Sequence, residues 1–291
     1  MNPYLGLALA VLSVSFSSLF IKLAHAPSLV IAFYRIFFTV LILAPYTIYK
    51  HHAEFKELHK KEVFLAIISG AFLALHLVTW FLSLEYTTVA SSTVLVTTQP
   101  IFVVIGSYIF FQEKIPFKAL FGGIIALLGS IFIGVTDFTI SGNALWGDIL
   151  ALIGAIAVSG YFLFGRHLRK RLSLLPYVLI VYASGVVVLF VCMLFTKTSF
   201  IGYGFNDYGL FLALAIICTI FGHTVFNWAL KYIKAPIVSI AILGEPIAAS
   251  LWVATILVPH EYPSVTQGIG GAIILIGLAL FTKVLITANV E

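Results

Sequence analysis

The sequence predicts an all-α integral membrane protein with ten transmembrane helices arranged as two inverted five-helix repeats. Three observations predict this fold: an apolar composition, ten apolar runs of membrane-spanning length, and an internal repeat. Of the 291 residues, 62% are hydrophobic and only 9% are charged, whereas a soluble domain carries about 25% charged residues. So few polar groups cannot cover a soluble domain, and a water-soluble fold is therefore excluded.

The ten apolar runs are the expected membrane helices. A bilayer core of about 30 Å is crossed by roughly 20 apolar residues in a helix, and Pro, Gly or charged residues separate the runs. The first run has no basic segment before it and no small-residue cleavage site after it, so we expect a retained helix. The expected spans are Tyr4–Ile21, Ser28–Tyr49, Val63–Leu84, Val89–Phe111, Ala119–Val135, Trp146–Phe164, Tyr177–Phe195, Tyr208–Leu230, Ala235–Val258 and Val265–Leu285.

The basic residues are distributed unevenly between the loops. If the N-terminus is cytoplasmic, thirteen of the sixteen Lys and Arg residues fall on the cytoplasmic side, whereas only Lys22 and Lys197 fall on the other. Because cytoplasmic loops are enriched in Lys and Arg, this asymmetry predicts that both termini are cytoplasmic. The net charge of +5 then reflects orientation in the bilayer, and no nucleic-acid partner is expected.

An internal repeat relates the two halves of the chain. The segment Leu84–Pro100 aligns without gaps on Leu230–Pro246, and the two share Leu, Tyr and the final Pro. GGIIALLG, Gly122–Gly129, matches GGAIILIG, Gly270–Gly277, after a two-residue shift. Since five is odd, a second five-helix unit crosses the membrane in the opposite sense. We therefore expect repeats at 1–140 and 141–291, alternating access, and a substrate site near the midplane between them.

Several motifs occur in the order and at the spacing of a known superfamily. They are FYRIFF in the second span, HLVTWFLSLEYTTVASSTVLVTTQPIFV across the third and fourth, QEK before the fifth, and GEP in the ninth. The chain resembles the drug/metabolite transporter (DMT) superfamily, specifically its EamA family. The resemblance implies a non-enzymatic carrier of the inner (cytoplasmic) membrane, often an exporter of amino acids or related compounds, that works without ATP. The chain indeed has no GxxxxGK[ST] motif.

Arg35 is a charged residue within an otherwise apolar span. It is the eighth residue of its expected helix, about 11 Å from the outer end at 1.5 Å per residue. Its side chain could snorkel to the outer interface. Alternatively it faces the cavity between the repeats and binds an anionic group such as a carboxylate, and the EamA resemblance favours this second interpretation.

Gln99 and Glu245 occupy equivalent positions of the repeat, each near the middle of a span and each followed by proline. A carboxylate at mid-membrane is costly. Glu245 is therefore a candidate for proton coupling or for pairing with a substrate ammonium, the alternative being a structural hydrogen bond to a neighbouring helix. Pro100 and Pro246 remove backbone donors, so both helices are expected to kink there.

Other polar and aromatic residues are candidate substrate contacts. His76 and Trp80 share one helix face, as do His223 and Asn227, although a histidine bonded to a neighbouring helix is the common alternative. Tyr34 and Tyr161 are candidates because they neighbour or oppose polar positions. Ser13 and Ser17 share a face but are expected to permit close helix contact, as are the glycines of the fifth and tenth spans. The full set of candidate substrate-binding residues is Arg35, Tyr34, His76, Trp80, Gln99, Tyr161, His223, Asn227 and Glu245.

A cation from Arg35 and an anion from Glu245, within aromatic walls, complement a zwitterion with an apolar side chain, and so predict a neutral or aromatic amino acid. An exchanger of phosphorylated or nucleotide-linked metabolites would need several basic cavity residues, and an intramembrane serine enzyme would need a nucleophile motif that VSGYF does not provide. The expected partners are the small-molecule substrate and the lipid bilayer, with a homodimer left open. No cofactor or metal is expected, and Cys192 and Cys218 are interpreted as free thiols.

Overall fold

The computed structural model describes residues 2–112, 116, 118, 121–126, 128–129, 131–132, 142–256 and 264–287. In these ranges the regular secondary structure is helical, and there is no strand. The predicted boundary between the repeats, at residues 140 and 141, lies outside the described residues, as do parts of the expected spans Ala119–Val135 and Ala235–Val258. The all-α architecture predicted from the sequence is confirmed for the part of the chain that is described.

Helices occupy most of the described residues. In chain order they are α1 (Pro3–Ser15), α2 (Ser17–Leu23), α3 (Ser28–Lys56), α4 (Lys60–Tyr86), α5 (Val89–Val96), α6 (Gln99–Phe111), α8 (Gly142–Leu168), α9 (Leu174–Phe195), α10 (Phe205–Ala213), the π-helix η1 (Leu214–His223), α11 (Thr224–Ala229), α12 (Ala235–Ala241), the 3₁₀ turn η2 (Ile242–Gly244), α13 (Glu245–Ile256) and α14 (Val265–Thr287).

Seven helical stretches among the described residues are long and apolar enough to cross a membrane. They correspond to seven of the ten expected spans, namely the first to the fourth and the sixth to the eighth. Of the other three, the fifth is described only in pieces, the ninth consists of α12, η2 and α13, and the tenth is α14. The protein is thus a multi-pass membrane protein, and the count of ten spans stays a prediction.

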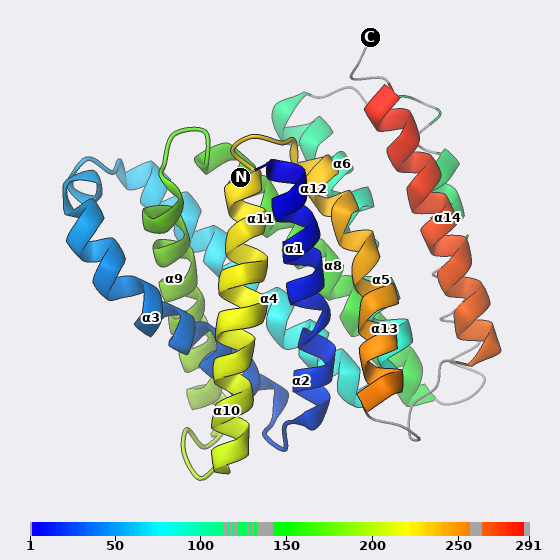
Figure 1. Cartoon of the computed structure of the whole chain (residues 1–291), viewed down its shortest axis with the longest axis horizontal. Coiled ribbons are helices and arrows are strands. Elements are labelled where there is room, and N and C mark those ends of the chain that lie inside the picture. Colours follow the sequence, from blue (N-terminus) through cyan, green and yellow to red (C-terminus); the bar gives the residue numbers. More distant parts are fainter. Residues whose placement is uncertain are drawn as a thin grey trace.

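The helices form one bundle in which α1 lies at the centre of the view (Figure 1). α1 packs against η1 and α11 on one side and against α13 on the other. α4 packs against both α8 and α9, and α3 lies beside α9 at one edge. α14 stands at the opposite edge of the bundle (Figure 1). Elements from the two halves of the sequence are therefore interleaved, not stacked as separate bodies.

Two glycines allow especially close helix contacts. A Cβ on Gly70 of α4 would lie 2.2 Å from the carbonyl oxygen of Val181 on α9. A Cβ on Gly122 would lie 2.5 Å from the carbonyl oxygen of Gly277 on α14. The expected close packing of the fifth and tenth spans is therefore confirmed at Gly122 and Gly277, whereas Gly268 has no neighbour within 4 Å of a built Cβ.

Two of the helices are interrupted at equivalent positions of the repeat. The chain turns between α5 and α6 at Thr97 and Thr98, just before Pro100, and the 3₁₀ turn η2 separates α12 from α13 just before Pro246. The hydroxyls of Thr97 and Thr98 donate to the carbonyls of Val94 and Leu95 at 2.9 and 2.7 Å. These hydroxyls therefore supply donors to carbonyl groups at the end of α5. The kinks predicted from the two prolines are confirmed.

Candidate substrate cavity

A small cavity lies in the interior of the bundle, where interrupted helices meet. Its volume is about 30 Å³, which is room for about two water molecules, so an amino acid does not fit in this conformation. It is lined by Val14, Ser17, His76, Trp80, Val96, Thr97, Gln99, Val158, Phe162, His223, Phe226, Ile242 and Glu245.

The helix interruptions build much of this cavity. Val96 and Thr97 lie at the α5–α6 turn, Ile242 begins η2, and Ser17 begins α2 directly after the interruption at Phe16. Non-helical backbone at membrane depth is tolerated only where protein buries it or where it lines a polar cavity. The breaks and the cavity are therefore one feature of the fold.

Equivalent residues of the two repeats face the cavity in pairs. In the ungapped frame that matches Leu84 with Leu230, Trp80 corresponds to Phe226, Val96 to Ile242, and Gln99 to Glu245. All six side chains line the cavity. The cavity consequently lies where the two repeats meet, which is where inverted-repeat carriers place their substrate.

Gln99 and Glu245 occupy the same place on their half-helices. Each is the first residue after an interruption, Gln99 in α6 and Glu245 in α13, and each is buried, at 3% and 6% exposure. The positive end of a helix dipole attracts a carboxylate in the first turn, so α13 offers Glu245 a favourable position. Only one of the two equivalent positions carries an ionisable group, and this makes the cavity chemically one-sided.

Two histidines and a tryptophan form the aromatic wall. The His76 ring stacks on Trp80 with centroids 5.7 Å apart, and the His223 ring lies 6.2 Å from His76. His76 Nδ1 lies 3.0 Å from the carbonyl oxygen of Gly154, which is the structural hydrogen bond considered for it. In the described part of the chain, the buried atoms Trp80 Nε1, His223 Nδ1 and Gln99 Oε1 have no hydrogen-bond partner. These three atoms are therefore free to form hydrogen bonds with a molecule in the cavity.

Arg35 is fully buried on α3. Its Nε donates to Thr219 Oγ1 on η1 at 2.8 Å, and its Nη1 donates to Ser17 Oγ at 3.4 Å. Its Cζ lies 5.7 Å from the ring centroid of Phe81. The interpretation that Arg35 snorkels to the outer headgroups is therefore wrong, because its guanidinium is surrounded by protein.

The guanidinium of Arg35 lies behind the cavity wall, since Ser17 both bonds it and lines the cavity. Its Nη2 has no hydrogen-bond partner among the described residues. An unpartnered donor on a buried cation is rare in proteins and marks a position that an anionic group would satisfy.

The π-helix η1 supplies the acceptor that holds Arg35. The Thr219 hydroxyl donates to the carbonyl of Leu214, five residues earlier, at 3.2 Å, and so keeps an acceptor lone pair for the guanidinium. π-Helical turns are rare and often occur at functional sites. Through Thr219, η1 is therefore hydrogen-bonded to Arg35, which is the fully buried charged side chain of α3.

Tyr161 and Asn227 lie beside the cavity without lining it. The Asn227 side-chain amide donates to the Tyr161 hydroxyl and, at 2.8 Å, to the carbonyl of His223. The Tyr161 ring lies 6.0 Å from that of His223. This pair therefore positions His223 from the side of α8 and α11.

Tyr34 lies away from the cavity, contrary to expectation. Its hydroxyl donates to the carbonyl of Phe200 at 2.5 Å, and its ring stacks on Phe211 at 5.2 Å. The reason is helical geometry, because consecutive residues point about 100° apart and Tyr34 cannot share the direction of Arg35. Five of the nine predicted residues line the cavity, namely His76, Trp80, Gln99, His223 and Glu245.

Sequence reasoning missed several lining residues, chiefly Ser17, Thr97, Phe162 and Phe226. Phe226 could have been found as the repeat counterpart of Trp80. Ser17 carried a signal as a polar residue in the first span, but it was interpreted as a packing residue. No group of three His, Cys, Asp or Glu side chains that could hold a metal occurs among the residues that the structure describes.

The structure is that of a multi-pass membrane protein with a small central cavity, and the comparison with known families identifies its class, a membrane transporter of small solutes. The EamA-like transporter family matches residues 1–135 and again residues 145–283. The chain belongs to this family. It is also similar to one crystal structure of a protein at 15% identity, with a TM-score of 0.69 over 97% of this chain and 98% of that chain. That likeness supports the fold alone. Comparison with curated proteins found no match.

Proposed function

We propose that the protein carries neutral or aromatic amino acids across the cytoplasmic membrane by alternating access, as an exporter. The observation that supports this most is the pairing of two opposite charges at one cavity: Glu245 lines it, and Arg35 stands behind Ser17 with an unpartnered Nη2. The direction of transport rests on the family resemblance. The repeats that move against each other are residues 1–140 and 141–291.

The two charges fit the two ends of a zwitterion. A substrate carboxylate would bond the Arg35 guanidinium, whose planar fork suits carboxylates. A substrate ammonium would pair with Glu245, and an apolar side chain would contact Trp80, Phe162 and Phe226. Because the cavity has a volume of only about 30 Å³, binding requires it to widen, as it would when the repeats rock apart.

A phosphorylated substrate fits this site less well. No lysine or arginine lines the cavity in the part of the chain that the structure describes, and Arg35 reaches it only through Ser17. A phosphate carries up to two negative charges and is usually held by several cations. The single cation and the single carboxylate favour a molecule with no net charge.

The test is transport by Arg35→Ala and Glu245→Gln in liposomes. Because hydrogen bonds to charged groups contribute about 1.5–3 kcal/mol, we expect the apparent substrate affinity to fall roughly 10- to 100-fold in each variant. Tyr34→Phe is the matched control and should transport normally, since Tyr34 lies outside the cavity. Thermal unfolding checks that each variant is folded, and Arg35→Lys replaces Arg35→Ala if the latter is not. Full amino-acid flux in both charge variants would refute the proposed site.

Proton coupling through Glu245 is a separate part of the proposal. Glu245 is the carboxyl group of the cavity wall, so it can carry a proton in one conformation and release it in another. We expect an imposed pH gradient to accelerate net flux by the wild type. At a substrate concentration that saturates the variant despite its lower affinity, Glu245→Gln should retain exchange at equal pH on both sides but lose the response to the gradient. Wild-type flux that ignores the gradient would disprove coupling while leaving the carrier function intact.

The orientation in the membrane follows from the loop charges. In the predicted ten-span topology, thirteen of the sixteen Lys and Arg residues fall on the side of the termini, so both termini are proposed to be cytoplasmic. A reporter protein that is active only in the cytoplasm should be active when it is fused to either end of the chain. A reporter that is active only on the outer side should be inactive at the same positions, and its activity would reverse this assignment.

A further inference from the structure

A second, larger hollow lies between α4, α6 and α8, and it shares no lining residue with the central cavity. Its volume is about 420 Å³. Its walls are mainly apolar and aromatic, with Leu65 and Phe72 from α4, Phe110 and Phe111 from α6, and Leu163 and Phe164 from α8. We call these residues, together with Lys61, Gly160 and His167, the lateral groove.

The floor of the lateral groove depends on Gly160. A Cβ at this position would lie 2.8 Å from the Phe72 ring, so the glycine allows the ring to lie directly on the backbone of α8. The side chain of Phe110 is 69% exposed at the groove. In a protein embedded in lipid, such a surface faces acyl chains, and an apolar groove of this size can hold one.

Two lysines and a histidine lie at one end of the lateral groove. Lys61 and His167 line it, and the His167 ring stacks on Phe111 with centroids 6.4 Å apart. Lys170 places its Nζ 5.8 Å from the centroid of the same Phe111 ring. These three basic side chains converge at the ends of α4, α6 and α8, which is where a headgroup would lie if an acyl chain filled the groove.

The nearest described acidic group on α4 is already compensated. Glu62 accepts from Arg171 Nη1 at 3.0 Å and from the backbone N–H of His59 at 3.0 Å. It therefore does not neutralise Lys61 or Lys170. The described residues at this end thus present positive charge next to an apolar groove, which is the combination that binds an anionic lipid.

We propose that the lateral groove is a binding site for one anionic phospholipid. An acyl chain lies along Leu65, Phe72 and Leu163, and the phosphate is held by Lys61 and Lys170. A second copy of the chain is a poorer occupant, because it would bring a like-charged rim toward the same basic end. This site is independent of the proposed transport cavity.

Native mass spectrometry of the purified full-length chain tests this, with phosphatidylglycerol and phosphatidylcholine of identical acyl chains as probes. The wild type should bind phosphatidylglycerol more tightly. A basic residue near the headgroups contributes about 1 kcal/mol, so Lys61→Ala and Lys170→Ala should each weaken the binding of phosphatidylglycerol about fivefold. The double variant should bind the two lipids equally. Leu65→Trp, which fills the groove, should weaken both lipids. Lys56→Ala is the control, because Lys56 is an exposed lysine at the end of α3 outside the groove.

Three results would overturn the proposal. The first is equal binding of the two lipids by the wild type. The second is a loss of phosphatidylglycerol affinity in Lys56→Ala as large as that in Lys61→Ala. This would mean that general surface charge, and not the groove, selects the lipid. The third is a dimer of the wild type that Leu65→Trp disrupts while lipid binding is unchanged, because this would assign the groove to a second copy of the chain.

Discussion

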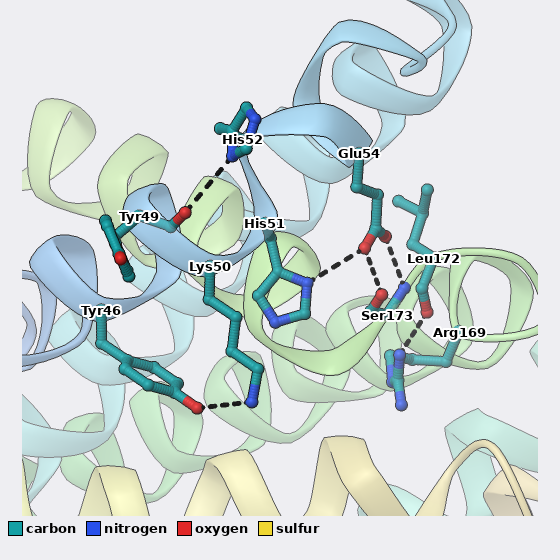
Figure 2. Close-up of polar contacts among 9 residues, drawn as sticks. All are labelled: Tyr46, Tyr49, Lys50, His51, His52, Glu54, Arg169, Leu172 and Ser173. Atoms are coloured by element: carbon teal, nitrogen blue, oxygen red, sulfur yellow. Dashed lines mark hydrogen bonds and ion pairs between the residues drawn. The ribbon is translucent and has the colours of Figure 1, made fainter.

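The two ends of α3 are held by the same chemistry but tie together different parts of the molecule. At its start, the backbone N–H and the hydroxyl of Ser28 donate to the carboxylate of Glu85, at the end of α4. Near its other end, Glu54 accepts from the backbone N–H of Ser173 at 2.8 Å and from its hydroxyl, at the N-cap of α9 (Figure 2). Glu54 lies 26 residues after Ser28, about 39 Å along a helix, which exceeds the roughly 30 Å of a bilayer core, so we expect the two contacts at opposite membrane faces.

The difference lies in which repeats the contacts join. Ser28 and Glu85 both belong to the first stretch that matches the family, residues 1–135, whereas Glu54 belongs to the first and Ser173 to the second, residues 145–283. If the repeats rock against each other, the Ser28–Glu85 contact can move as part of one body. The Glu54–Ser173 contact spans the moving boundary and must break or shift.

The contact between repeats is also the more elaborate of the two. α3 departs from helical dihedrals at His51 (φ −115°, ψ 19°), one turn before Glu54, and His51 Nδ1 lies 3.4 Å from the Glu54 carboxylate. The nearby Arg169 is almost fully buried and donates to the carbonyls of Leu172 and Asn227 (Figure 2 shows the first). This cluster therefore joins α3, the segment between α8 and α9, and α11.

The largest effect is expected from cross-linking the two contacts. In a chain whose native cysteines are replaced by alanine, the pair Glu54→Cys with Ser173→Cys, treated with a short bifunctional methanethiosulfonate reagent, should abolish transport. The pair Ser28→Cys with Glu85→Cys should retain most transport after the same treatment. Inhibition by the second pair as complete as by the first would show that both ends move, and the comparison would fail.

A smaller effect is expected from removing each carboxylate charge. Glu54→Gln weakens the contact between repeats, so the cavity should open more often toward that face. A cysteine at Ser17 should then react faster with a membrane-impermeant thiol reagent added from the side of Glu54. Glu85→Gln should leave the labelling rate unchanged and lower stability by at most about 1 kcal/mol, because its carboxylate is exposed. Equal labelling rates of this cysteine in Glu54→Gln and Glu85→Gln would show that Glu54 has no special role in closing the cavity.

The smallest effect is expected from the serine hydroxyls. Ser173→Ala and Ser28→Ala each remove one hydrogen bond and keep the backbone donor, so each should cost about 1 kcal/mol or less. Only Ser173→Ala should also change the transport rate, by roughly two- to fivefold. A change of the same size in Ser28→Ala would indicate that the hydroxyls affect general stability and not the motion.

The sequence predicted those features that depend on local pattern. The apolar runs located seven observed spans, the prolines predicted the interruptions before α6 and α13, and the ungapped repeat frame paired Gln99 with Glu245 correctly at the cavity. These features follow from bilayer thickness, from the missing proline donor and from the chemistry of a midplane carboxyl.

Features that depend on helix direction and on distant contacts were not predictable. α3 continues to Lys56, beyond the predicted end at Tyr49, because a charged segment ends the membrane span without ending the helix. Glu54 and its contact with Ser173 were therefore missed. The helix is interrupted at Phe16, where the sequence has no proline or glycine. The sequence therefore gave no reason to distinguish Ser17, which is buried, from Ser13, which is half-exposed.

The most direct test of the proposed function is counterflow of labelled amino acids into liposomes that contain the purified wild-type protein. The panel holds neutral, aromatic, acidic and basic amino acids. The one cation and one carboxylate at the cavity predict that unlabelled neutral or aromatic amino acid inside drives uptake of the labelled form, whereas acidic and basic members give little exchange. No exchange of any neutral or aromatic member, by protein shown to be folded, would contradict the proposed function.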